Sequence, residues 1–143
     1  MSSYGFRVYG IPAPQGSKVP GVSSKTGKMF VREQSGKTLH PWRQDVKEAA
    51  LMARGDQETL TAGVKLQITF FMPRPASVSV KKRPHPTVAP DLDKLIRGVG
   101  DALKQAGVYK DDAQVLGIQA SKVYASDDRE LSPGAWIVVS EIL

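Results

Sequence analysis

The segment from Asp91 to Gly107 constrains the fold more than any other part of the chain, because it carries a helical pattern between two defined ends. Apolar residues recur there at the spacing of one helix face, at Leu92, Leu95, Ile96, Val99, Leu103 and Ala106. Asp91 is a favourable N-cap residue, and Gly107 stands where a glycine commonly ends a helix. We therefore predict an amphipathic helix whose apolar face packs against another layer of the protein.

Several other segments have the composition of β-strands. They are residues 4–11, 28–33, 64–72, 115–124 and 135–143. The clearest is 64–72, where apolar and polar side chains alternate as in a half-buried strand. The polar stretch 126–134 predicts a hairpin loop between the last two strands.

A second helix is predicted to begin at His40-Pro41, because proline is tolerated at the first position of a helix. Its apolar face would carry Trp42, Val46, Ala49, Ala50 and Ala53, and Gly55 would end it. The order of elements then gives a sheet covered by two helices, and the length of 143 residues suits a single domain over residues 1–143. No internal repeat is present.

The net charge of +6 favours polyanionic partners, and the distribution of charge is more informative than its total. Residues 1–32 and 59–90 each contain five basic side chains and no acidic one, which suits contact with a phosphate backbone. Two stretches inside these segments predict exposed basic loops, the Gly- and Ser-rich residues 14–28 and the Pro-rich residues 73–90.

The chain contains no cysteine and only two histidines, which excludes disulfides, thiolate zinc sites and cysteine nucleophiles. A metal would therefore be bound through oxygen atoms. His85 is expected to be a loop residue rather than a ligand. We see no cationic leader with an apolar run and no stretch near the roughly 20 apolar residues that span a bilayer, so we expect a cytoplasmic protein with no membrane partner.

Five of the fourteen acidic residues fall within 22 residues of this basic chain, at Asp91, Asp93, Asp101, Asp111 and Asp112. Asp91 and Asp93 would lie together at the positive end of the predicted helix dipole, where two nearby acids repel unless a cation joins them. Asp112 can share a cation with Asp91 and Asp93 only if the fold brings it close to the start of this helix. The alternative is that these residues serve only as a helix cap and a solvated turn.

The stretch PDLDKLIRGVGDALKQAGVYKDDAQV resembles the core signature of the RusA family of Holliday-junction resolvases. The resemblance lies in Asp-Leu-Asp at 91–93 and in Asp-Asp-Ala-Gln-Val at 111–115, separated by an amphipathic helix of the family's usual length. It extends with lower specificity over residues 64–124. The N-terminal third matches only in its general style of strand, basic loop and Trp-containing helix.

This resemblance implies an α+β fold, a mixed sheet of four to five strands covered by two helices, in a homodimer. It assigns Asp91, Asp93 and Asp112 as catalytic carboxylates that bind Mg²⁺, or alternatively Mn²⁺, with Asp111 as a helper or turn residue. Arg97 would contact a phosphate or stabilise developing charge, unless it only joins a surface ladder with Asp93 and Asp101. Lys122 would be an accessory basic residue or a solvated strand residue.

The implied activity is metal-dependent hydrolysis of paired phosphodiesters in four-way junctions and related branched DNA, in a bacterial host cell and encoded by a phage or prophage. The residues expected to contact the DNA backbone are Arg74, Lys81, Lys82 and Arg83, with Lys18, Lys25 and Lys28 as a second group. These cations could instead serve solubility alone. Two other functions stay open, a non-catalytic DNA-binding protein and a nuclease of flaps or other branched nucleic acid.

Overall fold

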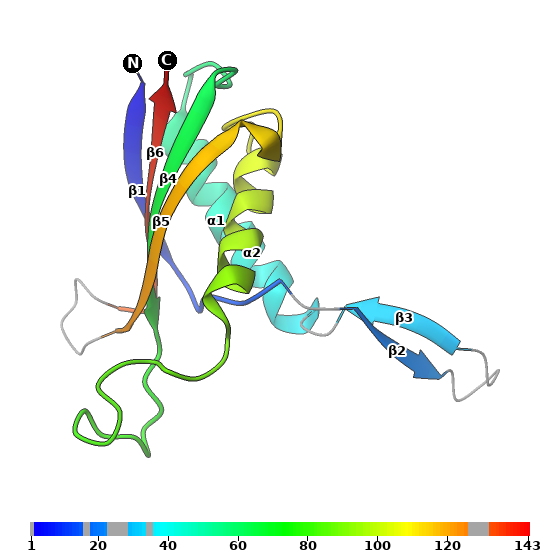
Figure 1. Cartoon of the computed structure of the whole chain (residues 1–143), viewed down its shortest axis with the longest axis vertical. Helices are drawn as coiled ribbons and strands as arrows, with labels where there is room; N and C mark the ends of the chain where they lie inside the picture. Colours follow the sequence, from blue (N-terminus) through cyan, green and yellow to red (C-terminus); the bar gives the residue numbers. More distant parts are fainter. Residues whose placement is uncertain (1, 16–17, 23–28, 34–35, 126–131) are drawn as a thin grey trace.

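The computed structural model describes residues 2–15, 18–22, 29–33, 36–125 and 132–143, and its centre is a four-stranded sheet. The elements are β1 (Ser3–Tyr9), β2 (Lys18–Val22), β3 (Met29–Glu33), α1 (Gly36–Arg54), β4 (Gly63–Met72), α2 (Leu92–Gln105), a 3₁₀ helix η1 (Asp112–Gln114), β5 (Val115–Tyr124) and β6 (Gly134–Ile142). In Figure 1, α1 and α2 lie on the same side of the sheet.

The strand order is β1-β6-β4-β5, with β1 and β5 at the edges. Strand β6 runs antiparallel to both β1 and β4, whereas β5 runs parallel to β4. The sheet is therefore mixed, and the prediction of an α+β fold with a mixed sheet and two helices is confirmed. A parallel pair needs a long crossover, and here it runs from β4 through the Pro-rich loop and α2 to β5.

The core lies between the helices and the sheet, and the apolar patterns of the sequence account for it. Leu95, Val99 and Leu103 form the buried stripe of α2, as the helical spacing predicts. From α1, Trp42 and Val46 pack into the same cluster of buried residues. Each such side chain contributes about 1.5–3 kcal/mol on burial, so the α2 stripe fixes the helix firmly over the sheet.

Helix α1 begins earlier than predicted. It starts at Gly36, so Pro41 lies inside the helix rather than at its first position. Inside a helix, proline removes one hydrogen bond and its ring crowds the carbonyl of residue i−4. At Pro41 this affects only the first turns of α1, and the buried apolar face of the following turns holds the helix in place. The end at Arg54, followed by Gly55 at φ 54°, is as predicted.

Two connections differ from the sequence predictions. The predicted basic loop 14–28 contains a strand, because β2 pairs antiparallel with β3 from Lys18 opposite Glu33 to Val22 opposite Met29. In addition, β5 and β6 are not joined as a hairpin, since β4 lies between them in the sheet. Residues 126–131 of the predicted hairpin loop lie outside the described residues.

Residues 73–90 form no helix or strand, which confirms the Pro-rich segment as an irregular connection. This connection leads directly into α2. Within the described ranges, no helix has the length and apolar character needed to cross a membrane.

We expect Leu95→Ala to lower the free energy of unfolding by about 3 kcal/mol, because it opens a cavity in a closed core site. Met52→Ala on α1 is the control, since Met52 is 85% exposed and its loss should change stability by about 0.5 kcal/mol or less. Urea denaturation followed by circular dichroism measures both. Equal stability of the two variants would contradict this packing.

Candidate metal centre

The first pair of predicted carboxylates lies at the N-terminus of α2. Asp91 occupies the N-cap position with extended backbone angles, but its side chain makes no capping hydrogen bond. Asp93 lies in the first helical turn, and both residues are exposed. The positive end of the helix dipole stabilises two acids there. Both carboxylates are therefore open to solvent, and Asp91 does not act as a hydrogen-bonding cap of α2.

Lys122 on β5 fixes the backbone that leads into this pair. Its Nζ donates to the carbonyl oxygen of Val88 at 2.7 Å and to that of Pro90 at 2.8 Å. The ammonium is thus committed to two main-chain acceptors directly before Asp91. Lys122 therefore links β5 to the backbone that enters α2, so it is not a freely solvated strand residue.

The other carboxylate lies in the turn between α2 and β5. Asp112 is the first residue of η1 and is exposed. Asp111 precedes it, and the Asp111 Oδ1 accepts a hydrogen bond from the Ala113 N–H at 2.9 Å. Of the two roles expected for Asp111, the structure shows that of a turn residue.

The side chain of Gln114 holds this turn in place with four hydrogen bonds. Its Oε1 accepts from the N–H groups of Lys110 at 2.8 Å and Asp111 at 2.9 Å. Its Nε2 donates to the carbonyl oxygens of Leu60 and Ala62, both at 2.9 Å. A carboxamide is the side chain that can accept at one end and donate at the other. Gln114 therefore ties the Asp112 turn to the segment that enters β4.

Sequence reasoning missed the role of Gln114, although a local signal was present. Asp111 and Gln114 have the spacing of a capping box, and the structure forms one. The two bonds to Leu60 and Ala62 join residues more than fifty positions apart. No local pattern could have indicated them.

The two carboxylate groups lie at opposite ends of α2 (Figure 1). The helix has 14 residues, and at 1.5 Å per residue it is about 21 Å long. No three His, Asp or Glu side chains in the described part of the chain lie close enough to hold one metal ion. A single copy thus brings Asp91 near Asp93 but does not bring Asp112 to them.

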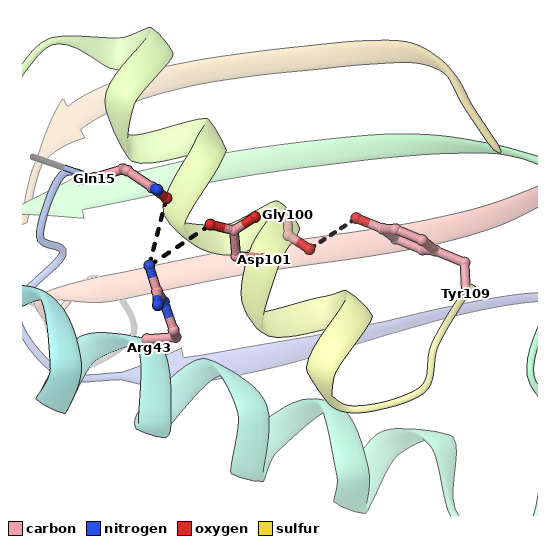
Figure 2. A network of polar contacts seen from close by, with 5 residues as sticks. All are labelled: Gln15, Arg43, Gly100, Asp101 and Tyr109. Atoms are coloured by element: carbon pink, nitrogen blue, oxygen red, sulfur yellow. Dashed lines mark hydrogen bonds and ion pairs between the residues drawn. The ribbon is translucent and has the colours of Figure 1, made fainter. Parts of the chain in front are cut away.

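A polar network joins the N-terminal segment, α1 and α2 beside this region (Figure 2). The Arg43 Nη2 lies 3.6 Å from the Asp101 carboxylate and donates to the Gln15 Oε1 at 3.4 Å. Asp101 therefore pairs with α1, and the ladder Asp93–Arg97–Asp101 considered from the sequence does not form in the described structure. Arg97 is exposed on α2.

The buried Tyr109 closes the C-terminal end of α2. Its hydroxyl donates to the Gly100 carbonyl oxygen at 2.9 Å (Figure 2). Burial raises the pKa of Tyr109 far above its ordinary value, and the negative charges of Asp112 and Asp101 raise it further. Tyr109 therefore stays protonated at physiological pH and acts as a hydrogen-bond donor rather than as a base.

The cations of loop 73–90 fall into two groups. The Arg74 guanidinium stacks on the Tyr124 ring at 4.1 Å and donates to the Arg83 carbonyl oxygen at 2.6 Å. The Arg83 Nη1 donates to the Tyr124 hydroxyl at 3.3 Å. These two arginines shape the loop, whereas Lys81 and Lys82 are exposed and free to meet a ligand.

The remaining predicted basic residues belong to the N-terminal region. Lys18 begins β2, and Lys25 and Lys28 lie outside the described residues. His85 is an exposed residue of loop 73–90, as expected.

Comparison with known proteins decides the family. The family model of the endodeoxyribonuclease RusA matches residues 12–130, which includes both carboxylate groups and α2. The chain belongs to the RusA family. The resemblance seen in residues 91–115 is therefore confirmed, and the match extends well into the N-terminal third, beyond what the sequence motifs indicated.

This RusA chain is similar to a bacterial protein and to a phage protein. It is 33% identical over 138 residues to the uncharacterized protein YqaN of Bacillus subtilis (strain 168), covering 90% of this chain and 93% of the relative. It is 28% identical over 128 residues to a protein of Lactococcus phage r1t described as crossover junction endodeoxyribonuclease rusA, covering 87% of this chain and 89% of the relative.

In this RusA chain we expect Gln114→Met to loosen the Asp112 turn, because methionine keeps the length but loses all four hydrogen bonds. At about 1 kcal/mol for each of several bonds, stability should fall by about 2–4 kcal/mol. The Lys110 and Asp111 amide protons should exchange faster with solvent. Gln105→Met, an exposed change on α2, is the matched control. Unchanged protection of both amides would show that Gln114 does not hold the turn.

Proposed function

We propose that this protein is a Mg²⁺-dependent endodeoxyribonuclease that resolves four-way DNA junctions as a homodimer. The observation that carries the proposal is that the carboxylates of Asp91, Asp93 and Asp112 are exposed and, among the described residues, unpaired. All three are exposed, and none has a hydrogen bond or ion pair from its carboxylate in the described part of the chain. Membership of the RusA family and the phage relative support the same reaction class.

The donor set suits a hard divalent cation. Carboxylate oxygens and water are the ligands that Mg²⁺ prefers, and the absence of cysteine removes softer alternatives. Asp91 and Asp93 supply one half of such a site, and Asp112 supplies the other. Because α2 separates the halves in one copy, a complete set of three carboxylates requires a second copy. The homodimer is therefore part of the proposed active site and not only a means of cutting two strands.

When bound, a divalent ion supplies an activated water and neutralises charge on the scissile phosphate. The protein's own part is to hold the ligands and to place cations nearby. Lys122 fixes the backbone before Asp91, and Gln114 fixes the turn that carries Asp112. Arg97 lies on the exposed face of α2 one turn beyond Asp93, where its guanidinium would offset negative charge on a phosphate.

DNA would approach from the end of the molecule that carries the N-terminus of α2. Lys81 and Lys82 lie exposed in the loop that leads to Asp91, so their charges reach the backbone of a strand bound at the carboxylates. The β2–β3 hairpin, which begins with Lys18, extends away from the sheet and helices (Figure 1). An extended basic hairpin is suited to follow a phosphate backbone, and Lys25 and Lys28 are proposed to add to it.

We expect the wild-type protein to nick a synthetic four-way junction in symmetric pairs when Mg²⁺ is present. Asp91→Asn, Asp93→Asn and Asp112→Asn should each slow cleavage by at least about 100-fold, since loss of even an outer-shell partner of a metal costs about 10–100-fold. Asp56→Asn, an exposed change after α1, is the control and should cleave normally.

Labelled junction, flap, duplex and RNA substrates should be compared side by side. Faster cleavage of the flap or of the RNA than of the junction would indicate a nuclease of flaps or other branched nucleic acid. Tight binding without cleavage at any Mg²⁺ or Mn²⁺ concentration would instead indicate a non-catalytic DNA-binding protein. Full activity in all three aspartate variants would refute the carboxylate assignment.

A further inference from the structure

In the described structure, both helices lie on one side of the sheet, and the other side is open (Figure 1). Buried and accessible side chains alternate along β4 from Val64 to Phe70, so every second residue of the strand faces away from the helices. Directly paired residues point to the same side of a sheet. The register therefore puts on the open side Arg7 and Tyr9 of β1, Trp136 of β6, Lys65 and Gln67 of β4, and Gln119 of β5. We call this surface the open face.

The strands give the open face positive charge and no acidic side chain. Arg7 and Lys65 are its cations. Among the residues of β1, β4, β5 and β6, Glu141 is the one acid. Glu141 pairs with the fully buried Val64, so it points to the side of the sheet that the helices cover. A surface with cations and without acids attracts a polyanion.

Trp136 gives the open face an aromatic platform. It is 44% exposed, although β6 is an inner strand of the sheet. A Cβ atom at Gly5 would approach the Trp136 ring to 3.0 Å. One side of the indole therefore lies over the bare backbone of Gly5, and the other side faces solvent. An exposed aromatic ring of this kind stacks on the bases of a single-stranded nucleic acid, whichever base is present.

Arg7 and a second exposed ring lie next to this platform. Arg7 pairs with Trp136 across the strands. Its guanidinium lies 4.6 Å from the centre of the Tyr9 ring and 4.7 Å from the centre of the Phe71 ring. These two contacts hold the cation on the open face, and Tyr9 is itself 65% exposed. Rings for bases and a cation for a phosphate thus stand side by side, as in surfaces that bind single strands.

A hollow beside Trp136 supplies polar groups for the edge of a base. It encloses about 340 Å³, and its lining includes the indole together with Gln67, Thr69, Gln119 and Ser121. Amides and hydroxyl groups each donate and accept hydrogen bonds, so they suit the mixed donors and acceptors of any nucleobase. The hollow therefore complements the stacking surface.

We propose that the open face binds an unpaired DNA strand, with one base stacked on Trp136 and its edge in the hollow. The choice of DNA rests on the proposed function, whereas the surface itself is separate from the carboxylates, because α2 lies on the other side of the sheet. The bases of an intact duplex are already stacked and paired, so they offer no free ring to the indole. The open face therefore selects the unpaired nucleotides of a branched substrate.

The intrinsic fluorescence of the protein reports this contact. The chain has two tryptophans, and Trp42 is 1% exposed, so a ligand on the open face quenches Trp136. With EDTA present to prevent cleavage, we expect an oligothymidine of about 12 nucleotides to quench the emission. A blunt duplex and an abasic strand of the same length should leave it unchanged, since the abasic strand keeps the phosphates and lacks the bases. No quenching by oligothymidine, or equal quenching by the abasic strand, would overturn the proposal.

Two variants test the stacking and the charge separately. Trp136→Ala should weaken the binding of labelled oligothymidine at least about 10-fold, as expected for the loss of one stacked base. Lys65→Ala should lower the slope of log affinity against log salt by about 0.7, as expected for one phosphate contact to a single strand. Lys47→Ala removes the same charge from α1 and is the control. Unchanged binding by folded Trp136→Ala contradicts the stacking, and if this variant does not fold by circular dichroism, the quenching of the wild-type protein decides.

Further outcomes separate the open face from the metal centre. Asp91→Asn should bind oligothymidine as tightly as the wild type. Junction cleavage without quenching of Trp136 would refute the open face and retain the nuclease, and quenching without cleavage would do the reverse. Tighter binding of an RNA strand would overturn the choice of DNA. A dimer in sedimentation that depends on Trp136, together with no quenching by oligothymidine, would assign the open face to a second copy instead.

Discussion

The rigid span of α2 is the constraint on which the rest of the structure depends. Asp91 and Asp93 lie at its N-terminus, whereas Asp112 lies in the turn that follows its C-terminus, and the 14 residues of the helix are about 21 Å long. A Mg²⁺ ion binds oxygen ligands at about 2.0–2.1 Å, and no three acidic or histidine side chains in the described part of the chain lie close enough to share one ion. The buried stripe of Leu95, Val99 and Leu103 holds the helix against the sheet. If these three aspartates form the proposed metal site, one copy supplies two separate parts of it and a second copy completes it.

Each of the two carboxylate groups lies beside a side chain whose polar atoms bind the protein's own main chain. The Lys122 ammonium donates to two carbonyl oxygens before Asp91. The Gln114 amide binds two N–H groups in the Asp112 turn and two carbonyl oxygens in the segment that enters β4. Arg74 is committed in the same way to the loop that precedes α2. The carboxylates themselves remain exposed. Neutral and cationic side chains thus position the backbone around the aspartates, and the aspartate oxygens stay open to a ligand.

Local patterns predicted the parts of the fold that are built from local periodicity. The stripe of α2, the alternation in β4 and the glycine stops at Gly55 and Gly107 all stand in the structure. The main errors concern long-range contacts. The insertion of β4 between β5 and β6 and the two Gln114 bonds to Leu60 and Ala62 depend on residues far apart in sequence. The β2–β3 hairpin is a local pairing that the Gly- and Ser-rich composition around its first strand concealed. The family motif predicted Asp91, Asp93 and Asp112 as the site carboxylates, which stays a prediction, and the placed backbone shows that α2 lies between the first two and the third.

Mixing two inactive variants tests the sharing of the metal site most directly. A mixed dimer of Asp91→Asn and Asp112→Asn has one site that lacks both groups and one that keeps all three carboxylates, so the mixture should regain Mg²⁺-dependent nicking of a single junction strand. Asp91→Asn mixed with Asp93→Asn should stay inactive, because both changes fall on the same half of the site. An Asp91→Asn and Asp112→Asn mixture that exchanges subunits yet never nicks would contradict a site built from two copies.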